Sequence, residues 1–536
     1  MSRQTLALLV VIPLLCLMMA SPIVAEEGEA AASNASKISN LVDGWFGVVN
    51  GVMAKTLFFQ IPLQSVEVEV SEEHPEGKKY VGIPIIVMIL ALGGIFFTVR
   101  YGFINVRLFG HAIQVVRGKF DKPDHHGEIS HFQALTSALS ATVGLGNIAG
   151  VAAAIALGGP GAIFWMWLIA FFGMSMKFSS CSFAQLYRRI GPDGRTLGGP
   201  MVYLQEGLAP ILSFPIAKVF GVMYAVLCIL ASFGGGNLFQ GNQTAAALIY
   251  TFGFERSDLA SGVVGLSLAI LAGIVIIGGI RRIGEVTSKI VPAMCLIYVG
   301  VCLFTIITNI DQAGPLLASI FTEAFTGNAV GGGAAGGIIV VFATGAQRAV
   351  FSNEAGVGSA AIAHSAAKTD EPIREGVVAM IGPFIDTIVI CTMTALTLLI
   401  TDVFGGEYSA KIGFGDGAIK TIEAFGTVHW SLKYVLCGAI FVFAYSTIIS
   451  WSYYGDRAVE YLVGPIGVWP YRVLFVILVA LGPFFTLGNV LDFSDYSLLS
   501  MAFPNIIGMV LLSGIVAAKT RDYVQRLRSG KMQVIK

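Results

Sequence analysis

Charged residues are scarce in this chain: Asp, Glu, Lys and Arg make up 12% of its 536 residues, against roughly 25% in soluble globular proteins. The 33 basic and 33 acidic residues balance, so the net charge favours no nucleic-acid partner. The seven cysteines form no CxxC or Cys/His pattern, which argues against a disulfide framework or a cysteine metal site. No HExxH, GxSxG or paired-aspartate pattern lies at membrane depth, so the sequence does not favour an enzyme.

What the chain has instead is apolar sequence. Hydrophobic residues make up 55% of it, and several runs reach the length of about 20 residues that a bilayer core demands. We therefore predict an all-α polytopic membrane protein with about eleven transmembrane helices. The expected spans lie near residues 80–100, 132–156, 160–186, 213–250, 259–280, 284–309, 333–366, 376–402, 430–460, 468–487 and 491–517.

The ends of the chain indicate its location and orientation. Residues 1–25 resemble a cleaved secretory signal peptide, with a retained first span as the alternative. We expect residues 26–79 outside the cytoplasm, with an interfacial helix near 38–59, and an extra transmembrane helix with a cytoplasmic loop in 80–131. Lys and Arg gather in alternate loops and in the tail 518–536. This pattern predicts a multi-pass cell-membrane protein with its N-terminus outside and its C-terminus in the cytoplasm.

The stretch Ala134–Ile155 is interrupted although it is apolar enough to enter a membrane. Gly144, Gly146 and Gly150 weaken its helix around the polar Asn147. Irregular backbone and a polar amide at this depth are tolerated only where they line a protected cavity. The alternative is a glycine-rich helix that packs closely on its neighbours.

A second stretch repeats this pattern later in the chain, where Ala343–Ala346 interrupts the helix expected near 333–366. Each break lies in the first helix of a set of five spans, and the two sets are 132–309 and 333–517. The sets enter the membrane from opposite sides, and an external connector, 310–332, joins them. Glycine-interrupted helices at corresponding positions of two halves indicate a transporter binding site. Half-helix N-termini attract a carboxylate, and freed carbonyls coordinate a cation such as Na⁺.

Two longer motifs resemble a known family. GGPGAIFWMWLIAFFG (Gly158–Gly173) and NEAGVGSAAIAHSAAKTDEPIREG (Asn353–Gly376) resemble the signature blocks of the alanine/glycine:cation symporters, also called sodium:alanine symporters. The resemblance covers most of the chain from residue 80 onward. It implies a leucine-transporter-like fold of two inverted five-helix repeats plus one extra helix, and Na⁺-driven uptake of alanine or glycine. TVGLGN (Thr142–Asn147) also resembles the unwound first helix of bacterial neurotransmitter:sodium symporters.

We expect the substrate to lie between the two breaks. The amides of Gly144 and Gly146 would hold its carboxylate. The resemblance points to Gln240 as a further contact, with a polar contact between helices as the alternative. Thr447 and Trp451 are four residues apart and share a helix face, where Trp451 would limit the size of the substrate side chain. The expected substrate-binding residues are Gly144, Gly146, Asn147, Gln240, Thr344, Gly345, Thr447 and Trp451.

Similarity to the wider fold also suggests where Na⁺ binds. The site would combine the hydroxyls of Ser446 and Thr447 with first-helix carbonyls near Ser140 and Val143. The alternative is that these hydroxyls bond to their own helix backbone, as Ser and Thr often do in membrane helices.

Three charges fall within the expected spans: Arg348, Glu354 and Asp386. Intramembrane charges usually face the bundle interior and pair there. We expect Arg348 and Glu354 on the cytoplasmic half of the helix near 333–366, which is the sixth helix when the extra first helix is not counted. There they would help to close an inner gate. They are six residues apart and so poorly placed to pair with each other; a proton relay is the alternative role.

The sequence thus predicts a secondary active symporter that works by alternating access, carries a small neutral amino acid with Na⁺ and needs no cofactor besides this coupling ion. Two other functions stay open. A proton-coupled amino-acid permease has the same architecture, and broken helices also occur in ion channels.

Overall fold

The computed structural model describes residue 44 and residues 46–534. Left out of that range are residues 57, 68–77, 122–125, 193, 256, 327–332, 405–416, 486 and 533. The predicted signal peptide, residues 1–25, lies outside the described residues.

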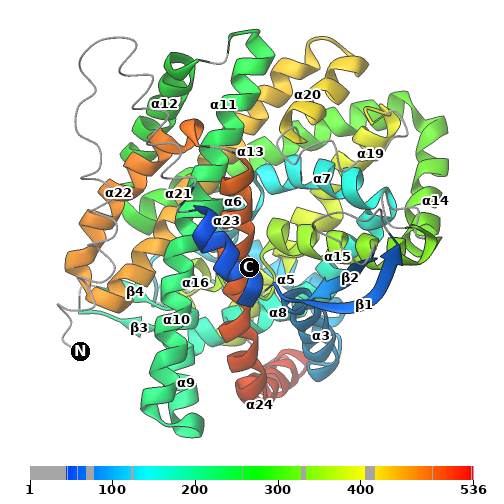
Figure 1. Ribbon diagram of the computed structural model, residues 1–536. Helices are drawn as coiled ribbons and strands as arrows, with labels where there is room; N and C mark the ends of the chain where they lie inside the picture. Colours follow the sequence, from blue (N-terminus) through cyan, green and yellow to red (C-terminus); the bar gives the residue numbers. More distant parts are fainter. Residues whose placement is uncertain are drawn as a thin grey trace.

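The described part of the chain is a bundle of long helices (Figure 1). Eight of its helices are long and apolar enough to cross a membrane, and one bent pair raises that number to nine. The prediction of an all-α polytopic membrane protein is therefore confirmed. Two further expected spans correspond to shorter or interrupted helices, namely α3 (Ile85–Arg100) and the pair α15 (Gly333–Asn353) and α16 (Ala360–His364).

The two sets of spans expected from the sequence, 132–309 and 333–517, contain the following elements. The first set contains α6 (His131–Thr142), α7 (Ala149–Gly158), α8 (Gly161–Tyr187), β3 (Arg189–Ile190), β4 (Thr196–Leu197), α9 (Pro200–Leu212), α10 (Phe214–Phe233), α11 (Phe239–Phe252), α12 (Asp258–Ile276) and α13 (Gly279–Thr308). After α14 (Ile310–Thr326), the second set contains α15, α16, α17 (Pro372–Ala379), α18 (Ile381–Pro383), α19 (Thr392–Ile400), α20 (Gly417–Val428), α21 (Leu432–Val463), α22 (Val468–Leu481), α23 (Leu487–Ser500) and α24 (Ala502–Arg528).

The N-terminal segment contains a β-hairpin that the sequence analysis did not predict. Strands β1 (Gln60–Glu67) and β2 (Lys78–Pro84) pair antiparallel, with a register shift after Pro62. The alternation of apolar and polar residues in SVEVEV is a strand signal that was overlooked beside the charged loop. The short helices α4 (Ile104–Arg107) and α5 (Phe109–Val116) follow α3.

Part of the expected interfacial helix is present, because residues 46–56 are helical. This helix crosses α23 in Figure 1, where the ring of Phe46 lies 5.1 Å from that of Phe493. The side chain of Asn50 donates to the carbonyl of Asn489 at 3.2 Å. The N-terminal helix is therefore packed on the last helices of the bundle.

Two helices outside the spans cover the first half of the bundle. In the connector, α14 lies on α8, where the indole N–H of Trp165 donates to the carbonyl of Ala324 at 3.2 Å. Helix α20 packs on the start of α7 so closely that a Cβ on Gly417 would lie 2.7 Å from the carbonyl oxygen of Ala149. Helix α20 thereby contacts α7, the second part of the first broken helix, whereas α14 contacts α8.

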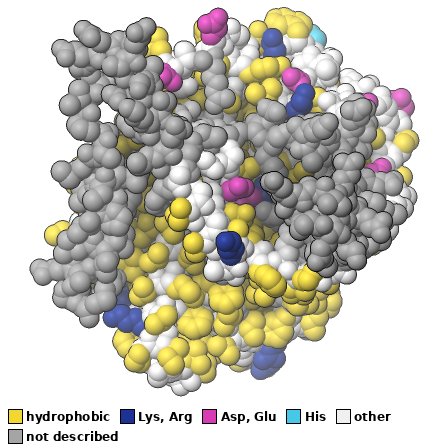
Figure 2. All heavy atoms as spheres, in the orientation of Figure 1, with side chains coloured by type: hydrophobic (Ala, Val, Ile, Leu, Met, Phe, Trp, Pro, Cys, Tyr) yellow, Lys and Arg dark blue, Asp and Glu magenta, His cyan; other side chains and the backbone are white. Residues whose placement is uncertain are grey.

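The helices differ in how much of their surface the bundle buries. In α8 and in the span Pro372–Ile400, 67% of the apolar window is buried, against 39% in α12 and 22% in the span that contains α22. Apolar side chains also cover the lower part of the face shown in Figure 2. Because lipid is as apolar as a protein core, exposed apolar helices mark the lipid-facing periphery of the bundle. The largely buried α8 lies at its centre.

Candidate functional site: two broken helices at the centre of the bundle

The first helix is broken where the sequence analysis predicted. Helices α6 and α7 meet at an angle of 58°, with a short 3₁₀ turn, Leu145–Asn147, after Gly144. The amide of Gly144 donates to the side-chain oxygen of Asn147 at 2.9 Å instead of to the carbonyl of Ser140. Asn147 therefore stabilises the break itself and frees a carbonyl that a continuous helix would have used.

The freed carbonyl of Ser140 lies at the predicted Na⁺ site. It accepts from the hydroxyls of Thr447, at 3.1 Å, and Ser446, at 3.5 Å, and all three residues are buried. The break also removes the helical partner of the Val143 carbonyl, because the amide of Asn147 donates to Gly144 at 3.1 Å. The structure thus brings three residues of the predicted Na⁺ site together, namely Ser140, Ser446 and Thr447.

The two hydroxyls have a second acceptor, which matters for binding a cation. The carbonyl of Phe443 accepts from Ser446 at 2.9 Å and from Thr447 at 3.0 Å. When both protons point to Phe443, the two hydroxyl oxygens keep lone pairs free beside the carbonyl of Ser140. Oxygen ligands of this kind suit a hard cation such as Na⁺.

Three of the predicted substrate residues also converge. A Cβ on Gly144 would lie 2.6 Å from the hydroxyl oxygen of Thr447 and 3.6 Å from the side-chain oxygen of Gln240. The amide nitrogen of Gln240 donates to the carbonyl of Gly235 at 2.9 Å, in a π-helical segment, Gly234–Leu238. Within the described residues its buried oxygen has no hydrogen-bond partner. A buried acceptor without a donor is costly, so this oxygen is suited to an N–H group of a ligand.

Trp451 lies one helical turn beyond Thr447 and is 2% exposed. Its indole N–H donates to the Glu354 carboxylate at 3.1 Å. Its side chain packs directly against Gly236, where an added Cβ atom would overlap the Cβ and Cγ atoms of Trp451. Trp451 therefore connects α21 with both the π-helical segment and the second broken helix.

The second break does not lie where the sequence analysis placed it. Helix α15 runs without interruption through Ala343–Ala346 and ends at Asn353. The break follows in residues 354–359, where Glu354, Gly356 and Gly358 all have positive φ. A single glycine costs a helix only roughly 1 kcal/mol, so Gly345 does not break it. The signal was the Gly-x-Gly of the AGVG motif, since glycine adopts positive φ readily.

Thr344 and Gly345 consequently pack elsewhere. A Cβ on Gly345 would collide with the backbone carbonyl of Ala162 in α8, so this glycine permits a close helix contact. Thr344 faces Gly158 at the end of α7. The structure therefore does not bring these two residues to Gly144, and Gly146 faces Phe351 and not Gln240.

Asp386 joins the two breaks, a role that the sequence analysis did not assign. One carboxylate oxygen accepts from Asn147 at 2.7 Å, and the other accepts from Ser352 and Thr387 at 2.8 Å each. Asn147 belongs to the first break, and Ser352 lies directly before the second. The fully buried Asp386 lies in a π-helical segment, Phe384–Cys391, within the span Pro372–Ile400.

A buried lysine completes this group. Lys177 of α8 is 2% exposed and donates to the carbonyl of Asn353 at 2.8 Å, at the C-terminal end of α15. A cation is stabilised at this end of a helix. The only sequence signal was a lone lysine in an otherwise apolar helix. A charge within a membrane span is energetically costly, so such a residue usually has a function.

The two expected gate residues have separate partners. Arg348 forms a buried ion pair with Asp495 of α23, to which Gln347 also donates at 3.0 Å. Glu354 accepts from Trp451 and from Ser359. Arg348 precedes the turn of the second break, and Glu354 is the first residue of that turn, with a positive φ. Their expected role in an inner gate stays a prediction. Arg348 joins the sixth helix to α23.

A cluster on the other side of the breaks ties the half-helices to their neighbours. The buried carboxylate of Glu375 in α17 contacts His131 at the start of α6 and His364 at the end of α16. One half of each broken helix, α6 in the first and α16 in the second, is therefore held by the same side chain.

We predict that Asp495→Asn and Arg348→Gln each destabilise the protein by about 3–5 kcal/mol, because either one removes the ion-pair partner of a buried charge. The double variant should recover part of that loss. Thermal unfolding of the purified variants, followed by size-exclusion chromatography, measures this. Single losses that simply add in the double variant would contradict the pairing.

Comparison with known proteins decides the family. The sequence model of the sodium:alanine symporter family matches residues 73–536. The chain belongs to the sodium:alanine symporter family. It is therefore a membrane transport protein and not an enzyme, as predicted.

Individual relatives agree with this assignment. The sodium/alanine symporter AgcS of Methanococcus maripaludis is 42% identical over 82% of this chain and 94% of its own length. The amino-acid carrier protein AlsT of Bacillus subtilis is 37% identical over 83% of this chain and 90% of its own.

Among solved structures, MhsT in complex with L-phenylalanine covers 73% of this chain and 99% of its own, at 13% identity and a TM-score of 0.46.

Proposed function

We propose that the protein couples the entry of Na⁺ to the uptake of small neutral amino acids, alanine or glycine, by alternating access. The observation that carries this proposal is the break at Gly144. It frees the Ser140 carbonyl beside the hydroxyls of Ser446 and Thr447, and it places Gln240 next to the same glycine. Membership of a sodium:alanine symporter family supports the same conclusion.

In this proposal Thr447 stands between the two ligands. Its hydroxyl contacts the Ser140 carbonyl on one side and lies closest to Gly144 on the other. A Na⁺ ion at the hydroxyls would fix α21 against α6, and so fix the surface that receives the amino acid. The amide of Gly144 already donates to Asn147, so the substrate carboxylate would bind the amide of Gly146 in the 3₁₀ turn, where the helix N-terminus carries partial positive charge.

The proposal is tested with purified protein in sealed vesicles. An inward Na⁺ gradient should drive alanine uptake above equilibrium, and replacement of Na⁺ by choline should stop it. Equal uptake in choline with a pH gradient would show a proton-coupled permease instead. Unitary currents in a planar bilayer would show a channel.

Thr447→Val should raise the Na⁺ concentration for half-maximal uptake at least about tenfold, or about 1.4 kcal/mol. Valine keeps the shape of threonine but removes the hydroxyl that faces Ser140. Ser452→Ala is the matched control, because this buried hydroxyl of the same helix bonds only to the carbonyl of Ile449, at 2.7 Å, among the described residues. An unchanged Na⁺ dependence in Thr447→Val would remove this residue from the site.

Trp451→Ala should widen the range of amino acids that compete with alanine, because it removes the largest side chain on the substrate-facing stretch of α21. Valine and leucine should gain most. Competition profiles measured against radiolabelled alanine test this, with Trp430→Ala, an exposed tryptophan, as the control. If larger amino acids compete no better than in the wild type, Trp451 does not limit substrate size.

A further inference from the structure

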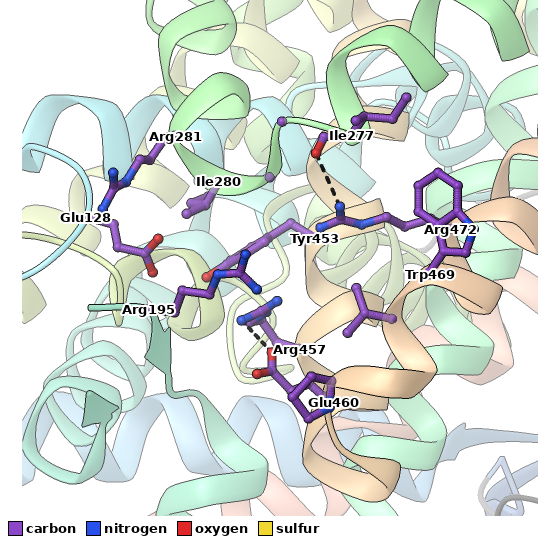
Figure 3. Close-up of a pocket in the computed structure, with 14 residues that line it drawn as sticks. Glu128, Arg195, Ile277, Ile280, Arg281, Tyr453, Arg457, Glu460, Trp469 and Arg472 are labelled. Carbon is purple, nitrogen blue, oxygen red and sulfur yellow. Dashed lines mark hydrogen bonds and ion pairs between the residues drawn. The ribbon is translucent and has the colours of Figure 1, made fainter. Parts of the chain in front are cut away.

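A cavity of about 380 Å³ lies away from the two breaks, on the side that the distribution of Lys and Arg places toward the cytoplasm. It forms where the turn from α12 to α13 meets the end of α21 and the start of α22 (Figure 3). No step of the proposed transport cycle uses it. Its lining is charged, and its exposed edge combines arginines with apolar side chains.

Arginines dominate the charged wall. Arg195, Arg281, Arg457 and Arg472 line the cavity together with two carboxylates, Glu128 and Glu460. Arg472 is paired with Asp456 outside the lining, and Glu460 with Arg457. The carboxylate of Glu128 accepts from the amide of Thr196 at 2.8 Å. Positive charge is therefore in excess at this site.

Two buried donors at the wall have no acceptor. The hydroxyl of Tyr453 and the Nε of Arg457 are without a hydrogen-bond partner within the described residues, and the two residues are 3% and 6% exposed. One oxygen of Glu460 also lacks a hydrogen bond there, but its charge is compensated by the ion pair with Arg457. The guanidinium carbon of Arg457 lies 5.3 Å from the centre of the Tyr453 ring, so the two donors belong to one surface. Unpartnered buried donors beside excess positive charge call for an anion rich in acceptor oxygens.

The rim of the cavity indicates where this anion comes from. Ile277 and Trp469 line the cavity and are 62% and 60% exposed. They end α12 and begin α22, two of the least buried spans of the bundle. An exposed tryptophan at the end of a lipid-facing helix is typical of the membrane interface. A soluble anion needs no apolar rim, whereas the acyl chains of a lipid do.

We propose that this cavity binds the phosphate of an anionic phospholipid headgroup from the inner leaflet. Basic pockets between membrane helices on this side are suited to such headgroups. The phosphate oxygens accept from Tyr453 and Arg457, and the acyl chains lie along Ile277 and Trp469. Because Arg457 stands on α21, ten residues after Thr447, the headgroup holds the inner end of the helix that carries the candidate Na⁺ ligands.

Native mass spectrometry of the purified full chain tests this, with phosphatidylglycerol, phosphatidylcholine and inorganic phosphate as separate probes. Wild-type protein should bind phosphatidylglycerol at least tenfold more tightly than phosphatidylcholine. Arg457→Gln and the conservative Tyr453→Phe should each weaken phosphatidylglycerol binding at least fivefold. Arg282→Gln, an exposed neighbour outside the lining, should leave it unchanged.

Three results would overturn the proposal. The first is equal binding of the two lipids to wild-type protein, and the second is equal phosphatidylglycerol binding by all variants. The third is saturable binding of inorganic phosphate that Tyr453→Phe abolishes while lipid binding stays the same, which would show a site for a free anion. None of these measurements depends on alanine transport, so they stand apart from the proposed function.

Discussion

Replacement of Gly144 by alanine is expected to lower Na⁺-dependent alanine uptake at least about 100-fold, which corresponds to about 2.7 kcal/mol. The new Cβ would lie 2.6 Å from the hydroxyl oxygen of Thr447. Either Thr447 must turn away from Ser140 or α6 and α21 must separate. Both movements disrupt the candidate Na⁺ site and the substrate surface together. Initial uptake rates in sealed vesicles measure the effect.

Gly150→Ala provides the matched control for this experiment. Gly150 lies in α7, six residues after Gly144, and a Cβ there would meet nothing within 4 Å. Alanine also favours a helix interior over glycine. Uptake by this variant should stay close to that of the wild type. If Gly144→Ala transports as well as Gly150→Ala, the ligands do not meet at the first break.

Removal of the carboxylate that joins the two breaks should have an effect of similar size. Asp386→Ala removes the carboxylate that accepts from Ser352 and Thr387 in a buried site. It also removes one acceptor of Asn147, whose amide still has the Ser352 hydroxyl and a backbone carbonyl. Each such loss costs about 1–3 kcal/mol. We expect uptake to fall at least about 100-fold, and the Na⁺ concentration for half-maximal uptake to rise in any residual activity.

Two further variants separate the role of Asp386 from general damage. Asp386→Asn keeps one acceptor oxygen and should fall between wild type and Asp386→Ala. Asp258→Ala removes an exposed carboxylate at the start of α12 and should change nothing. Folding of each variant is checked by its elution profile in detergent. A folded Asp386→Ala protein with more than half of wild-type uptake would show that the breaks need no such link.

The first break could be predicted because its causes are local. Glycines on both sides of a buried asparagine weaken the helix within six residues, and the structure shows Asn147 closing the turn on Gly144. Ser446 and Thr447 were placed beside that break through the resemblance to the wider fold. Their contact with Ser140 spans about 300 residues of sequence and depends on how α6 packs against α21. No local pattern contains that information.

The second break was misplaced for a related reason. Gly345 and Gly356 look alike in the sequence, but Gly345 meets a neighbouring helix within a continuous α15, whereas Gly356 adopts a positive φ. Only tertiary packing distinguishes a glycine that permits close contact from one that permits a turn. The roles of Asp386 and Lys177 were missed because their partners lie on other helices.

The central claim is that the first break binds Na⁺ and the amino acid next to each other. The dissociation constant of alanine for the purified protein, measured in NaCl and in choline chloride, tests it most directly. We predict binding at least about tenfold tighter in Na⁺, with alanine tightening Na⁺ binding by the same factor, because coupling between two sites is reciprocal. Equal affinity for alanine in the two salts would contradict the account.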